Sequence, residues 1–405
     1  MITQAKQSFA NSITHRILAM KFAGEFMLIY PIYTIMYTDR GGVDAAGVSV
    51  LLAFGLILLV LLELPTGVIA DKIARKYVLV ASILLKTLGL TIWLFLPFFW
   101  GYMLSTVCFA LGYALESGAL QAYLYGTLGE DSKKKFGKFW ARVSAMVMVS
   151  YTVAYIFTTI IGVNYPLLIG LSIGASLVAL AFCLSLPKDK LIRNSEDQKP
   201  KILASALKHI TSTPDLVKLL ITAVIIVSLA EVMIEYLSLY YNQAGIEARY
   251  VALMLAAGNV AGALLFWTLH SWETFLDRYK LYLLLGVTLL FIASFSGGVA
   301  IAAIGVLIFT RFLRVLQVQF ESNIQHLSND EARATISSVG SFAAKLVAAA
   351  IIICVGIFAV DNSILVPLRI ALVTGVVVFI IFQLFDKRRA HQKIKQDAES
   401  FEGLQ

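Results

Sequence analysis

The ionisable side chains inside long apolar stretches are the residues of this sequence most able to do chemistry. The acids among them are Glu25, Glu116, Glu231 and Glu235. An ionisable group in the middle of a bilayer costs about 2.5–3.5 kcal/mol on insertion scales, so its presence indicates a function. We therefore take these four acids as candidates for carrying protons.

Glu231 and Glu235 lie one helical turn apart. Two carboxylates at that spacing repel each other in a medium of low dielectric constant. One of them is expected to hold a proton at neutral pH, or each to have a separate basic partner. The alternative is a permanent ion pair of one acid with Lys345 or Arg311.

The other two acids each have a candidate partner. Lys21 precedes Glu25 by four residues, a spacing at which opposite charges on a helix pair. Arg142 and Glu116 are expected to meet across a helical hairpin, because they lie at depths of roughly 7 and 13 Å from its connecting loop. Each pair either takes part in proton coupling or only ties neighbouring helices together.

Basic and aromatic residues within the apolar stretches suggest how a substrate is held. Arg311 and Arg314 share a helix face and can bind a carboxylate or phosphate through paired hydrogen bonds, unless Glu231 or Glu235 neutralises them. Tyrosines favour aromatic or lipophilic cargo, although packing or aromatic belts at the membrane surface explain them equally well. The remaining candidate substrate-binding residues are Arg142, Tyr30, Tyr33, Tyr236, Asn259 and Lys345.

Several motifs for enzymatic chemistry are missing from the sequence. No GxxxxGK[ST], HExxH or CxxC pattern occurs. The three cysteines lie singly in apolar stretches, where they are expected to be small buried hydrophobic residues. We expect no enzyme activity, no metal and no cofactor.

The composition indicates which elements must position these residues. Of 405 residues, 59% are hydrophobic and 14% are charged, whereas a soluble domain has about 45–50% and about 25%. Since a membrane-spanning helix needs about 20 apolar residues, the chain predicts an all-α integral membrane protein with twelve transmembrane helices. The predicted spans are 17–37, 47–70, 77–98, 100–125, 138–163, 165–186, 215–241, 249–270, 280–297, 299–325, 337–360 and 363–385.

The longest polar segment, 187–214, divides the spans into two sets of six. The predicted domains are an N-terminal half over 1–186, a cytoplasmic linker over 187–214, a C-terminal half over 215–385 and a cytoplasmic tail over 386–405. The polar amino terminus predicts that no signal peptide is removed.

The lysines and arginines predict the orientation. Most of the 33 fall in one set of loops, and only Arg40 and Arg249 fall in the opposite set. Because positive loops stay inside, both termini are expected in the cytoplasm of a multi-pass protein in an inner or plasma membrane.

The two predicted halves carry a similar acid–base pair of residues at equivalent positions. Asp71–Lys72 follows span two, and Asp277–Arg278 follows span eight, at the equivalent point of the second half. With Gly67, Arg75 and Lys76, the first loop resembles the signature of the major facilitator superfamily and departs from it at Ala74, where glycine is usual. The resemblance covers the architecture of essentially the whole chain.

The resemblance implies a cytoplasmic gate that stabilises the outward-facing state, formed by Gly67, Asp71, Lys72, Arg75, Lys76, Asp277 and Arg278. Simple anchoring by positive charge is the alternative. The resemblance also implies that span one lines the cavity and often carries a coupling acid. It further implies that an acid–arginine pair across spans four and five serves some proton-coupled members. Spans three and twelve are usually peripheral in that family, so we leave Lys86 and Arg369 out of the site.

We expect a secondary active transporter that works by alternating access as a monomer. Its leading form is a proton antiporter that exports lipophilic or drug-like compounds, and the alternative is a proton-coupled importer of a small anionic nutrient. A non-transporting receptor or lipid scramblase is the alternative of another class. The expected partners are a small-molecule substrate, protons and lipid, but no nucleic acid.

Overall fold

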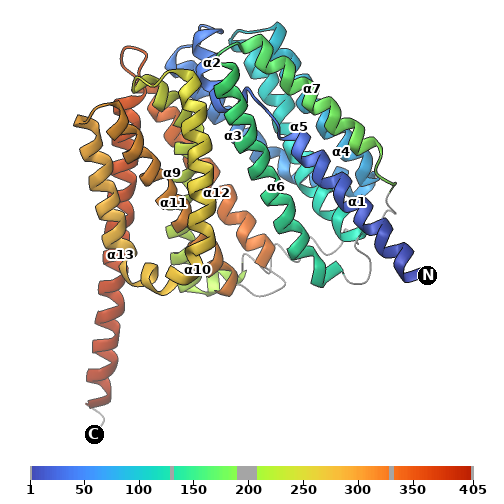
Figure 1. The fold of residues 1–405 in the computed structure, drawn as a ribbon. Coiled ribbons are helices and arrows are strands. Elements are labelled where there is room, and N and C mark those ends of the chain that lie inside the picture. The colour runs from blue at the N-terminus through green and yellow to red at the C-terminus, as the bar shows by residue number, and fades with distance from the viewer. Residues whose placement is uncertain (1, 128–131, 189–207, 328–332, 403–405) are drawn as a thin grey trace. The chain divides into compact units, whose positions relative to one another are not determined.

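The computed structural model describes the chain except for residues 1, 128–131, 189–207, 328–332 and 403–405 (Figure 1). The described residues are helical apart from short connections and one isolated bridge between Val360 and Ser363. The elements are α1 (Ile2–Gly24), η1 (Tyr30–Ile32), α2 (Tyr33–Asp39), α3 (Ala45–Lys72), α4 (Arg75–Phe95), α5 (Phe99–Thr127), α6 (Ser132–Ile161), α7 (Tyr165–Leu184), α9 (Pro214–Gln243), α10 (Ala248–Ala293), η4 (Ser294–Ser296), α11 (Val299–Leu327), α12 (Arg333–Ile357) and α13 (Leu365–Glu402).

Eleven helical segments in the described chain, two of them in α10, are long and apolar enough to cross a membrane. The remaining predicted span, 17–37, is not one continuous helix. Helix α1 ends at Gly24, the chain is irregular through Ile29, and η1 and α2 follow. The chain is therefore a multi-pass membrane protein whose first span is broken.

The prediction of a loop between spans eight and nine is wrong. Helix α10 runs through the whole segment, with two apolar stretches at Ala248–Leu265 and Arg278–Ser296. The intervening sequence mixes polar and apolar residues and has no glycine or proline between 266 and 277. Polarity alone does not end a helix, because backbone hydrogen bonding continues where no residue opposes it.

The described helices fall into two compact units by their internal contacts. The first comprises 1–196, 235–264 and 352–364, and the second comprises 197–234, 265–351 and 365–405. These units mix segments from both predicted halves. The division of the chain into two six-helix halves stays a prediction.

In the first unit, α4 packs against α5 and α7, and α1 packs against α6 and α7. Close packing of α4 on α5 depends on a glycine, since a Cβ at Gly112 would lie 2.8 Å from Lys86 Cγ and 3.0 Å from the Ser82 carbonyl oxygen. Small residues allow this approach between membrane helices, where packing replaces the hydrophobic effect as the driving force. The buried apolar cluster of this unit includes Ile17, Met20, Leu79, Leu120, Tyr123 and Cys183.

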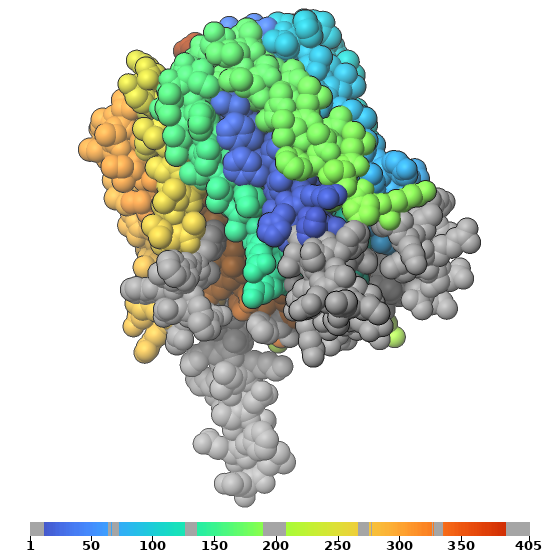
Figure 2. Space-filling view, turned by 45° about the vertical axis from the view of Figure 1, so that its right-hand side comes forward, coloured from blue at the N-terminus to red at the C-terminus, as the bar shows by residue number. Residues whose placement is uncertain are grey.

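Helices α1, α6 and α7 lie at the surface in Figure 2, coloured from blue to green. Apolar side chains on α6 and α7 are exposed, among them Phe157, Ile160, Leu171 and Leu177. Exposed apolar surface on long helices fits contact with lipid.

Packing in the second unit also uses a glycine and polar side chains. A Cβ at Gly375 of α13 would lie 2.5 Å from a methyl group of Leu229 in α9, so these helices approach closely there. Gln383 Nε2 donates to Thr222 Oγ1 at 3.0 Å and joins the same two helices. The second unit thus holds α9 and α13 together by close contact and a hydrogen bond.

The break in the first span is stabilised by side chains of α6 and α7. The Leu28 N–H donates to Ser172 Oγ at 2.9 Å, and Thr158 Oγ1 donates to the Leu28 carbonyl at 2.6 Å. Ser150 Oγ donates to the Phe22 carbonyl at 2.6 Å. A backbone group without a partner costs several kcal/mol in the lipid core, so these hydroxyls allow the helix to break there.

We expect Thr158→Val to destabilise the protein by about 1–2 kcal/mol, because it removes the donor to the Leu28 carbonyl. Thr159→Val is the matched control, since the Thr159 hydroxyl donates to the Tyr155 carbonyl in its own helix. Unfolding in detergent, followed by circular dichroism, measures the difference. Equal losses in the two variants would contradict the role of Thr158.

Candidate functional site

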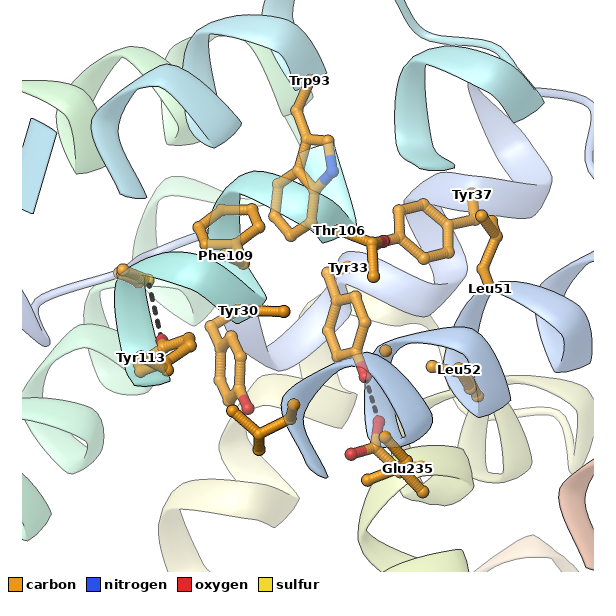
Figure 3. A pocket seen from close by; sticks show the side chains of 15 residues that line it. Tyr30, Tyr33, Tyr37, Leu51, Leu52, Trp93, Thr106, Phe109, Tyr113 and Glu235 are labelled. Carbon is orange, nitrogen blue, oxygen red and sulfur yellow. Dashed lines mark hydrogen bonds between the residues drawn. The ribbon is translucent and has the colours of Figure 1, made fainter. Parts of the chain in front are cut away.

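A cavity of about 200 Å³ lies in the first unit (Figure 3). We call it the aromatic cavity. A space of about 10–15 Å³ holds one water, so this cavity is much larger than a packing defect. It is lined by Met27, Tyr30, Tyr33, Tyr37, Leu51, Leu52, Gly55, Leu56, Leu59, Trp93, Thr106, Phe109, Ala110, Tyr113 and Glu235.

Stacked rings form much of its wall. Tyr33 lies between Tyr30 and Trp93, with ring centroids 5.4 and 6.0 Å away and interplanar angles of 15° and 8°. Tyr37 meets Tyr33 edge-on at 5.5 Å, and Phe109 contacts Trp93 at 4.8 Å. Such arrays are favourable beyond their buried area and present ring faces that attract cations.

Glu235 of α9 is the one charged residue among the fifteen that line the aromatic cavity. The Tyr33 hydroxyl donates to Glu235 Oε2 at 2.8 Å, as Figure 3 shows. A carboxylate in such surroundings can bind a cationic group or a proton. Within the described ranges, no group of three or more His, Cys, Asp or Glu side chains is placed to hold a metal ion.

A second group of charges lies where α1 ends. We call Lys21, Glu25, Lys86 and Glu116 the charge cluster. Lys21 Nζ lies 2.6 Å from Glu25 Oε1 and also binds Glu116. Lys86 Nζ lies 2.6 Å from Glu116 Oε2 and 3.6 Å from Glu25 Oε1. Two acids and two lysines make the cluster formally neutral, which is how buried charges are tolerated.

The expected pairing of Lys21 with Glu25 is observed, but the expected pair of Glu116 with Arg142 is wrong. Glu116 binds Lys21 and Lys86, and Arg142 is exposed on α6. Lys86 comes from α4, which packs directly on α5. Sequence reasoning left Lys86 out as peripheral, although a charge in the middle of a span already indicated a buried partner.

Tyrosines connect the charge cluster to the aromatic cavity. Tyr151 donates to Glu25 Oε2 at 2.7 Å and stacks on Tyr30 at 5.8 Å. Lys86 Nζ lies 4.9 Å from the ring centroid of Tyr113, which lines the cavity. The charge cluster therefore contacts the cavity wall through Tyr113.

The two acids of α9 have different surroundings. In the second unit, Glu231 Oε1 lies 3.8 Å from Arg314 Nη1, and Arg314 donates to Gln317 at 2.7 Å. Glu235 contacts Tyr33 in the first unit. For Glu231 the observed contact with Arg314 agrees with the alternative in which an acid of this helix neutralises a central arginine.

The other predicted substrate-binding residues lie outside the aromatic cavity. Arg311, Lys345 and Asn259 are half-buried on α11, α12 and α10. Tyr236 is buried, and its hydroxyl lies 2.6 Å from Ser49 Oγ and 3.1 Å from the Ile352 carbonyl oxygen. This arrangement joins α9 to α3 and α12 and forms no part of the cavity wall.

The predicted gate residues are mostly helical, which corrects their placement in loops. Gly67, Asp71 and Lys72 belong to α3, and Asp277 and Arg278 belong to α10. The side chains of Asp71, Lys72 and Asp277 and the surroundings of Gly67 lie outside the described residues. Arg278 is exposed and stacks over the ring of Tyr279 at 5.7 Å.

Two basic gate residues bind backbone carbonyls of neighbouring helices. Arg75 Nη1 donates to the Ala122 carbonyl of α5 at 3.2 Å, and Lys76 Nζ donates at 2.7 Å to the carbonyl of Leu184, the last residue of α7. A cation at a helix C-terminus, as Lys76 is here, satisfies a free carbonyl and interacts favourably with the helix dipole. Ala74 has φ −53° and ψ 123°, which any L-residue adopts, so this turn does not need the usual glycine. A latching role stays a prediction.

Lys86→Met is expected to destabilise the protein by about 3–5 kcal/mol, because it leaves the charge cluster with an uncompensated buried acid. Lys86→Met combined with Glu116→Gln restores neutrality and is expected to recover at least half of the loss. Arg142→Gln, at an exposed site, is the control. Unfolding in detergent tests these values, and a double variant no more stable than Lys86→Met would contradict charge compensation.

Comparisons with known proteins give the same architecture. The family model described as Major Facilitator Superfamily matches residues 17–352. No curated protein matches the sequence. The solved nucleoside transporter NupG has 12% identity and a TM-score of 0.73, covering 93% of this chain and 99% of that chain.

Two further solved structures are similar. A bacterial homologue of the human lysosomal transporter Spinster has 14% identity and a TM-score of 0.72, covering 94% of this chain and 97% of its own. A D-xylose–proton symporter has 10% identity and a TM-score of 0.70, covering 92% and 97%. At these identities the likeness concerns the fold, and the family match covers most of the chain. This chain therefore belongs to the Major Facilitator Superfamily and has its twelve-helix transporter fold.

Proposed function

We propose that this protein is a proton antiporter that exports lipophilic aromatic cations from the cytoplasm and binds them in the aromatic cavity. The observation that carries the proposal is the composition of the cavity wall. Aromatic rings surround one carboxylate, Glu235, and none of the fifteen lining residues is basic. A cation there gains from the ring faces and from the carboxylate, whereas an anion would be repelled.

The positions of the arginines do not favour the anion importer. Arg142 is exposed, and Arg314 lies beside Glu231 with its guanidinium bound to Gln317. Neither of them lines the aromatic cavity, and neither does Arg311. The cationic cargo is thus better supported than a carboxylate or phosphate cargo.

Glu235 is the better candidate for the coupling acid. Glu25 and Glu116 each contact two lysines in a neutral cluster, so a proton on either acid would leave a net positive charge buried. Glu235 lines the cavity and accepts a hydrogen bond from Tyr33, so its carboxylate lies where cargo would bind. A proton and a cationic cargo would compete for its carboxylate. Binding one would release the other, which is the exchange that antiport needs.

In proteoliposomes with an imposed pH gradient, we expect Glu235→Gln to lower gradient-driven ethidium transport at least tenfold. The amide can neither release a proton nor carry the charge that attracts the cation. Glu231→Gln, one helical turn away, is the matched control and is expected to keep most of the activity. Full activity in Glu235→Gln would rule out this residue as the coupling acid.

Arg311→Ala is expected to change ethidium binding less than twofold, because this residue does not line the cavity. Fluorescence titration of the purified protein measures the affinity. A tenfold loss of ethidium affinity would place the cargo at α11 and contradict the aromatic cavity. Binding without any gradient-driven transport in the wild type would favour a receptor.

A further inference from the structure

The indole N–H of Trp93 is a buried donor on the wall of the aromatic cavity. Trp93 is 4% exposed, and its Nε1 has no hydrogen-bond partner among the residues that the structure describes. Figure 3 shows its ring above Tyr33, with the nitrogen on the side of Thr106 and Tyr37. Buried donors are rarely left unpaired, because the lost hydrogen bonds to water are then not replaced.

The surroundings of Trp93 fix its position. Its ring stacks on Tyr33 at 6.0 Å and contacts Phe109 at 4.8 Å, both measured between ring centroids. Arg40 donates to the carbonyls of Trp93 at 3.3 Å and of Leu94 at 2.8 Å and so ties down the end of α4. The indole is therefore a donor held in place before cargo arrives, and preorganised groups cost less to use in binding.

A second polar group lies elsewhere on the same wall. The Glu235 carboxylate accepts a hydrogen bond from Tyr33, and Tyr33 stacks on Trp93. An indole N–H can only donate, and an ionised carboxylate can only accept. The cavity wall thus carries a group that only donates and a group that only accepts, and Tyr33 contacts both of them.

We propose that Trp93 determines specificity by selecting cargo with a hydrogen-bond acceptor. The favoured class is lipophilic aromatic amines in which a protonated nitrogen meets Glu235 and a carbonyl or ring-nitrogen acceptor meets Trp93 Nε1. This inference rests on the proposed function, since it assumes that cargo occupies the aromatic cavity. Cations without an acceptor still bind through charge and ring contacts, but they leave the indole N–H unpaired.

A matched pair of probes tests the assignment. 3-Dimethylamino-1-phenylpropan-1-one and N,N-dimethyl-3-phenylpropylamine differ by a carbonyl in place of a methylene. Calorimetric titration of the purified full chain is expected to show about fivefold tighter binding of the ketone, the ratio given by one neutral hydrogen bond of about 1 kcal/mol. Trp93→Phe keeps an aromatic ring but removes the N–H donor, so the two amines are expected to bind this variant with equal affinity.

Two further variants separate the possible failures. Trp100→Phe, at a site 70% exposed, is expected to keep the fivefold preference. Glu235→Gln is expected to weaken both probes equally. A preference that persists in Trp93→Phe, or a wild type without one, would overturn the role of Trp93 and leave the proposed function standing. Failure of both amines to bind the wild type would overturn the cationic cargo class itself.

Discussion

Charge compensation at the end of α1 is the constraint on which the rest of the site depends. Glu25 and Glu116 are buried, and neither can remain ionised without a positive partner. Lys21 and Lys86 supply that charge from α1 and α4, and Gly112 gives Lys86 the room to approach α5. The cluster thereby ties three helices together at one depth.

The break in the first span follows directly after this cluster. Because α1 stops at Gly24, the backbone at Leu28 needs new partners, which Ser172 and Thr158 provide. The chain then re-forms as η1 and α2, which carry Tyr30, Tyr33 and Tyr37 into the cavity wall. Interrupted helices at membrane depth are tolerated where protein lines a cavity, and they commonly carry binding sites.

Features that depend on the local sequence were predicted better than features that depend on packing between distant segments. The apolar stretches predicted the spans well, since membrane insertion depends on local hydropathy. The prediction of a loop around Asp277 is wrong, because α10 continues through this segment. The candidate site was predicted in part: Tyr30, Tyr33 and Glu235 line the cavity, but Trp93 was missed, because an indole in an apolar span has no distinctive sequence signal.

The sequence by itself determined that this chain is a helical membrane protein with few and costly buried charges, and that Lys21 pairs with Glu25. Both follow from composition or from spacing along one helix. Only the tertiary structure decided that Glu116 pairs with Lys86 instead of Arg142, and that Glu231 and Glu235 have different surroundings. The reason is that a side chain's partner depends on the rotation and depth of each helix against its neighbours, and these are fixed by packing between segments far apart in the chain.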